Sequence, residues 1–235
     1  MPRAGILFAA LLCCGARVGA AQTSSGSVDG VFWPELDVYY RASEQVRLYG
    51  IATYTFGPAP LVDNAQYGLN VDFFAKRKKF FKHRPAIDAL AFDRTQPFQL
   101  RLGYRYATDL GTPDPATQNR ILAEATGRVS RGPFTLADRN GFDFRWTDGE
   151  YSTRYRNRLW LEAVLTLGSY QPVPYADAEW FYSIQNAEWT KVRYEAGVHF
   201  PMGHVVAVEP YAAWEDSWDG SPDQRGLGLN LVLSW

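Results

Sequence analysis

The 235-residue sequence contains little cysteine and little histidine. Its two cysteines, Cys13 and Cys14, both lie near the N-terminus, and the rest of the chain has none. That remainder therefore has no disulfide framework and no thiolate metal site, which excludes zinc-ribbon and thiol-nucleophile chemistry. The three histidines, His83, His199 and His204, are too few and too scattered to indicate a metal site or a Ser–His catalytic pair. We therefore expect neither a cofactor nor a metal and name no catalytic residue; a lipid-modifying enzyme is the least favoured alternative.

Long apolar runs and a strong net charge are also missing. Beyond the first twenty or so positions no run reaches the 18 apolar residues typical of a transmembrane helix. The formal net charge is −1, so the chain lacks the basic excess of nucleic-acid-binding proteins. Lysine is scarce, and four of the five lysines fall within residues 76–84. We expect no nucleic-acid partner.

The N-terminus has the pattern of an export signal. Arg3 precedes a short apolar stretch, residues 6–14, and small residues follow at Gly19, Ala20 and Ala21. We expect a signal peptide over residues 1–21, a flexible lead-in over 22–34, and one domain over 35–235.

Period-two alternation of apolar and polar residues runs through nearly the whole of that domain. Residues 98–106 are one example: Phe98, Leu100 and Leu102 alternate with Gln99 and Arg101. Eleven such segments are present, separated in several places by turn residues such as Asp148-Gly149. The pattern predicts an all-β, antiparallel, up-and-down barrel. Because bacterial single-chain membrane barrels have even strand numbers, we expect ten to twelve strands and favour twelve, with residues 86–92 as the additional strand.

Alternation alone does not say which face points inward, but three features favour an inverted barrel with a polar interior. The polar face mixes glycines such as Gly68, Gly103, Gly197 and Gly228 with bulky arginines, a pattern that fills narrow barrels. Aromatic residues recur at strand ends, as in the girdles of membrane barrels. The C-terminal segment carries the third feature, a single apolar face that ends in an aromatic residue: Leu227, Leu229, Leu231, Leu233 and Trp235. We expect a transmembrane barrel in the bacterial outer membrane, with this last segment as its assembly signal.

Charges on the polar face are close to balance, which favours ion pairing over a pore selective for one sign of charge. The expected lumen network consists of Arg101, Arg105, Arg120, Glu124, Asp143, Arg154, Arg156, Arg158, Glu162, Glu179, Arg193 and Glu195. Wider candidates on the same faces include Arg47, Asp72, Arg145, Asp177, Lys191 and Glu209. Such a lumen predicts a largely closed structural or envelope-associated barrel; a narrow channel for small solutes is the alternative.

The expected partners are outer-membrane lipid and the barrel-assembly machinery. The basic run at residues 76–84 (KRKKFFKHR) is either a solvated loop or a contact for anionic headgroups, with lipopolysaccharide phosphates as a candidate if the loop is extracellular.

Several segments together resemble a family of bacterial outer-membrane-like proteins, the domain of unknown function numbered 2490. The resemblance is carried by LRLGYRY (Leu100–Tyr106), QNRILAEA (Gln118–Ala125), RYRNRLWLE (Arg154–Glu162) and the terminal strand, and it spans roughly residues 35–235. It implies an outer-membrane barrel but no substrate.

Overall fold

A computed structural model describes residues 27–58, 63–75 and 96–235. Within them the chain forms strands β1 (Val28–Arg41), β2 (Val46–Thr55), β3 (Asn64–Phe74), β4 (Phe98–Asp109), β5 (Thr117–Arg131), β6 (Phe134–Thr147), β7 (Glu150–Ala163), β8 (Val173–Ser183), β9 (Glu188–Pro201), β10 (Val206–Ser217) and β11 (Gln224–Ser234). No helix in the described part is long and apolar enough to cross a membrane. The all-β prediction is confirmed.

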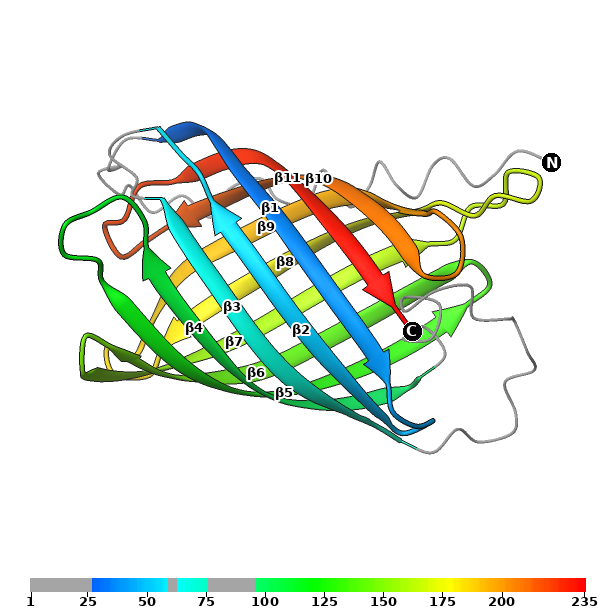
Figure 1. Cartoon of the computed structure of the whole chain (residues 1–235), viewed down its shortest axis with the longest axis horizontal. Coiled ribbons are helices and arrows are strands. Elements are labelled where there is room, and N and C mark those ends of the chain that lie inside the picture. Colours follow the sequence, from blue (N-terminus) through cyan, green and yellow to red (C-terminus); the bar gives the residue numbers. More distant parts are fainter. Residues whose placement is uncertain (1–26, 59–62, 76–95) are drawn as a thin grey trace.

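The strands close into a barrel in which each pairs with its sequence neighbours, and β1 completes the circle against β11 (Figure 1). All neighbouring pairs are antiparallel except β1–β11, which is parallel, with Leu36 opposite Leu231. The arrowheads of the blue and red strands therefore point the same way in Figure 1. We call the end where β11 finishes the C-terminal rim, and the end where β1 begins the N-terminal rim.

The described strands number eleven, within the expected range, but the preference for twelve is wrong. The even-number rule assumes that the first and last strands run antiparallel, and a parallel β1–β11 pair removes that requirement. β3 also pairs directly with β4, from Asn64 opposite Asp109 to Phe74 opposite Gln99. The additional strand expected at residues 86–92 lies outside the described residues, as do the expected signal peptide and the basic run at 76–84.

The barrel begins earlier than expected. β1 starts at Val28, inside the segment interpreted as a flexible lead-in, rather than at Glu35. Val28, Val31 and Trp33 pack with Tyr211 and Ala213 in a buried apolar cluster, which accounts for the order of this segment. Gly30 has a φ of 86°, and the register with β11 shifts between Asp29 and Val31, so the strand contains a bulge at this glycine.

Large apolar side chains point outward and charged ones point inward. Leu69, Leu227 and Leu102 are 75%, 63% and 55% exposed, whereas Asp72 and Asp143 are fully buried. In β11 Leu227, Leu229 and Leu231 are exposed, whereas Asn230 and Val232 are buried. Trp235, directly after the strand, is exposed as well.

Glycines make room inside the barrel for large rings. One row across five neighbouring strands reads Tyr175, Gly197, Tyr211, Gly228 and Trp33. A Cβ placed on Gly228 would lie 1.9 Å from the Tyr211 ring, so that ring rests directly on the glycine. This alternation of large and small residues is the packing expected in a narrow barrel.

Candidate functional site

Buried charges line the inner wall of the barrel and form ion pairs between neighbouring strands. Asp72 on β3 forms ion pairs with arginines from both neighbouring strands. Arg47 Nη2 on β2 lies 2.6 Å from Asp72 Oδ2, and Arg101 Nε on β4 lies 2.6 Å from Asp72 Oδ1. Arg101 also lies 3.9 Å from Glu124 on β5. Two arginines therefore compensate the charge of one fully buried aspartate.

Arg156 on β7 is the centre of the network. Its guanidinium lies 2.5 Å from Glu124, 3.1 Å from Asp143 and 3.2 Å from Glu179, so it pairs with acids from β5, β6 and β8. To contact Glu124 on β5, the Arg156 side chain must pass over the intervening strand β6. Gly141 of β6 pairs with Glu124 on one side and with Arg156 on the other. A Cβ on Gly141 would lie 2.9 Å from Glu124 Cγ, so the glycine leaves space for this crossing.

A second group of ion pairs lies on the inner face of β7, β8 and β9. Arg158 contacts Asp177 on β8 at 2.7 Å and Glu195 on β9 at 3.4 Å, and Arg193 lies 3.3 Å from Glu195. Tyr175 donates its hydroxyl hydrogen to Glu195 over 2.8 Å.

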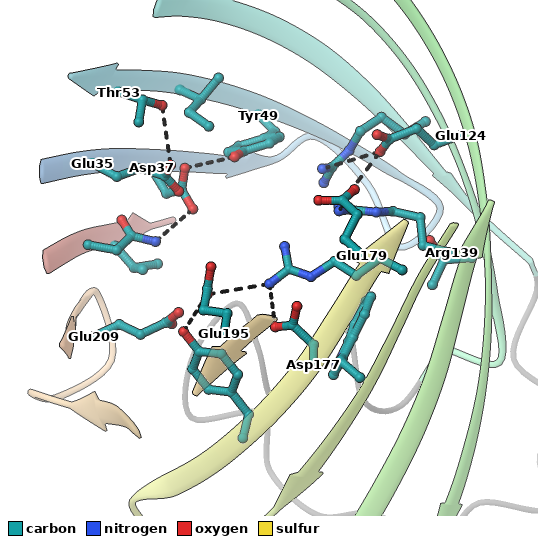
Figure 2. Close-up of a pocket in the computed structure, with 18 of the residues that line it drawn as sticks. Glu35, Asp37, Tyr49, Thr53, Glu124, Arg139, Asp177, Glu179, Glu195 and Glu209 are labelled. Atoms are coloured by element: carbon teal, nitrogen blue, oxygen red, sulfur yellow. Dashed lines mark hydrogen bonds and ion pairs between the residues drawn. The ribbon is translucent and has the colours of Figure 1, made fainter. Parts of the chain in front are cut away.

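The interior also contains a cavity of about 310 Å³, to which each of the eleven described strands contributes at least one residue. Figure 2 shows Glu35, Asp37, Tyr49 and Thr53 on one side of it and the Glu124–Arg139–Glu179 group across from them. Asp37 accepts hydrogen bonds from Tyr49 at 2.7 Å and from Asn230 at 3.0 Å. The lining is largely polar, so the cavity suits water or a small polar solute better than an apolar ligand.

The structure brings together ten of the twelve residues expected in the network, each in at least one ion pair. Arg105 and Glu162, the other two residues, also lie in the interior, where both line the cavity. Arg105 forms no ion pair within the described residues, and its side chain passes over Gly68. Glu162 is buried and lines the cavity.

Two members were missed by the sequence analysis. Arg139 contacts Glu179 at 3.2 Å, and Glu215 contacts Lys191 at 2.5 Å. The period-two alternation of the sequence places both residues on the inward face. Arg139 lies on the same face of its strand as Gly141 and Asp143, and Glu215 lies on the same face as Glu209 and Tyr211.

His199 lies fully buried on β9, with Nδ1 3.3 Å from Glu209 Oε2 on β10. It is therefore a buried residue, two positions before the end of β9 at Pro201. His204 lies in the connection after β9, and His83 lies outside the described residues. Among the described residues, no group of three or more histidine, cysteine or acidic side chains is arranged to hold a metal ion.

Comparison with known proteins yields one match. A family model described as a protein of unknown function, DUF2490, matches residues 70–224, which is more than half of the chain. No curated protein and no solved structure matches.

Proposed function

The chain belongs to the DUF2490 family, and we propose that it is an outer-membrane β-barrel with a largely closed, ion-paired lumen and a structural or envelope-associated role. The observation that carries the proposal is the inversion of the barrel, in which leucines face outward and fully buried Asp72 and Asp143 face inward. Burying charge while exposing leucine is unfavourable in water, but it suits a barrel surrounded by lipid.

The distribution of aromatic residues supports the same location. On the outer surface near the N-terminal rim, Trp189 contacts Tyr155 and Tyr182, and Tyr194 contacts Trp214. Near the C-terminal rim, Tyr40, Phe73 and Trp235 are exposed. Aromatic rings at both ends of an apolar band are typical of barrels at membrane interfaces, and lipid is the partner that we propose for this surface.

Fractionation of bacteria expressing the full chain tests the location. We expect the protein in the outer-membrane fraction, with a mobility on unboiled gels that differs from the boiled form, and a periplasmic protein recovered separately as the control. Recovery as a soluble periplasmic monomer would contradict the proposal.

A narrow channel is the second candidate, and the polar cavity favours it. The cavity is too modest in size for a wide pore, and many arginine, tyrosine and tryptophan side chains fill the barrel. Open water-filled lumens are typical of barrels of about 16 strands. Single-channel recording in planar bilayers separates the two candidates. A closed barrel gives no reproducible steps, whereas discrete steps of constant size would establish the channel.

A further inference from the structure

Four arginines surround one acidic side chain near the N-terminal rim, and we call Asp143 with Arg120, Arg145, Arg154 and Arg156 the Asp143 cluster. Arg154 Nη2 lies 2.8 Å from Asp143 Oδ2, Arg156 Nε lies 3.1 Å from Oδ1, and Arg120 Nη1 lies 4.0 Å from Oδ2. The strand register also places Arg120 directly opposite Arg145. Like charges directly opposite each other destabilise a sheet, so this arrangement calls for further negative charge.

The acids available nearby do not balance the cluster. Arg156 also pairs with Glu124 and Glu179, which leaves Arg120, Arg145 and Arg154 to share the single charge of Asp143. Glu215 interacts with Arg154 at longer range but is itself paired with Lys191 at 2.5 Å. Asp219, in the connection after β10, interacts with Arg145 at longer range. The cluster therefore keeps an excess of positive charge.

One donor of the Arg145 guanidinium has no partner. Its Nε is buried and has no hydrogen-bond partner, and within the described part of the chain Arg145 forms no ion pair. It lies two residues before the end of β6 at Thr147, close to the N-terminal rim. A buried guanidinium nitrogen without an acceptor is costly. The Nε atoms of Arg105, Arg156, Arg158 and Arg193 are buried without a hydrogen-bond partner as well. At Arg145 this feature coincides with the excess of positive charge, so an anionic acceptor fits this position.

We propose that the Asp143 cluster binds a phosphate group through Arg120, Arg145 and Arg154. Guanidinium groups match phosphate oxygens in paired hydrogen bonds, and a phosphate dianion would balance the excess charge of three arginines and one aspartate. The phosphate belongs either to a free solute that enters at the N-terminal rim or to a lipid headgroup. The inference does not depend on the proposed membrane location or on a closed lumen.

Titration calorimetry on the full folded chain in a non-ionic, phosphate-free detergent tests the site. Inorganic phosphate is titrated at constant ionic strength, with chloride as the competing anion. We expect saturable binding that Arg145→Gln weakens by about tenfold or more, because paired charge-assisted hydrogen bonds are lost. Arg225→Gln is the matched control, since Arg225 is an exposed arginine in β11 near the same rim, and it should bind phosphate as the wild type does.

Without phosphate, Arg145→Gln should unfold at the same temperature as the wild type or at a higher one, since it removes an opposed like charge. If this variant does not fold, Arg145→Lys keeps the charge but loses the paired geometry, and it should still weaken binding. Soluble short-chain phosphatidic acid provides the second titration: equal affinity for both compounds indicates a free phosphate, and binding of the lipid alone indicates a headgroup. Absence of binding to both compounds, or unchanged phosphate affinity in Arg145→Gln, would overturn the proposal.

Discussion

At the scale of single residues, the ion pairs of the interior converge on Arg156. Its side chain is 9% exposed, and its three acidic partners are between 0% and 8% exposed. Water therefore screens these pairs little, and removal of the arginine leaves buried carboxylates without compensation. Surface ion pairs of the same length would matter far less.

Arg156→Ala should lower the free energy of unfolding by about 3–5 kcal/mol, the usual cost of leaving a buried charge unpaired. Thermal unfolding in detergent measures the effect, and Arg225→Ala on the outer surface is the control, with a change within about 0.5 kcal/mol. A change below about 1 kcal/mol in Arg156→Ala would indicate a hydrated lumen in which water replaces the lost partner. Bilayer conductance of the same variant shows whether loss of the pairs opens an ion path.

Gly228→Ala should destabilise the barrel by about 1–3 kcal/mol, because the new methyl group would overlap the Tyr211 ring at 1.9 Å. A double-mutant cycle with Tyr211→Ala measures this contact. The alanine at position 228 should cost much less once the ring is gone, and an equal cost in both backgrounds would show that the clash is not with Tyr211.

At the scale of elements, alternation in the sequence predicted the strands well, because period-two patterning is a local property. The eleven segments counted from the sequence correspond to the eleven strands of the described residues. The pairing between β1 and β11 is not local, and nothing in either strand's alternation shows whether the two run parallel. Without the direction of this pairing, the even-number rule for membrane barrels applies, and it favours twelve strands over eleven.

Prediction of the interior was limited by a similar problem. The inward faces followed from glycine and arginine positions, so most network members were found. Their partners did not follow, because Arg156 reaches Glu124 across an intervening strand, and that requires both the register and the gap at Gly141. The Asp143 cluster likewise becomes visible only when the register aligns Arg120 with Arg145.

Leu231→Arg in the terminal strand should impair insertion and cost about 2–4 kcal/mol if that residue faces lipid near the midplane. Leu231 is 39% exposed on the outer surface. Gln66→Arg, whose side chain lines the polar cavity, is the matched control and should be tolerated far better. Insertion is measured as the heat-modifiable fraction. Equal tolerance of both arginines would mean that water, not lipid, surrounds the leucines.

Trp235→Ala should also reduce insertion if the terminal strand is the assembly signal. In the barrel the Trp235 backbone joins β1 through hydrogen bonds with Tyr39 and Arg41, 3.0 and 2.8 Å long, and these need no particular side chain. A loss of insertion with unchanged thermal stability of the folded fraction would therefore indicate recognition. Insertion at the wild-type level would contradict the signal role.

At the scale of the whole molecule, the odd number of described strands puts the beginning of β1 and the end of β11 at opposite rims. The connections after β1, β5 and β9 share the C-terminal rim with the end of β11. Those after β6, β8 and β10 share the N-terminal rim with the start of β1. β3 also ends at the C-terminal rim.

Single cysteines report on this arrangement cleanly, because the only native cysteines are Cys13 and Cys14. Ser43→Cys should react with a membrane-impermeant thiol reagent from one side only. Asn186→Cys and Asp219→Cys should react from the other side, together with Asp29→Cys at the start of β1. All four positions are exposed. Labelling of Asp29→Cys from the same side as Ser43→Cys would contradict the parallel pairing of β1 with β11.

The β1–β11 pair also bears on how fast the barrel can form. It joins residues 28–39 to 224–234, nearly the full length of the described chain, and such contacts form slowly because the long intervening loop must first be closed. Until then β1 and β11 are both open edges able to pair with other chains. Closure itself adds the Asn230–Asp37 hydrogen bond and brings the Val28–Val31–Trp33 segment of β1 against β11. A catalyst that holds the two edges together would speed this long-range closure, and this is the physical reason to expect dependence on an assembly machinery.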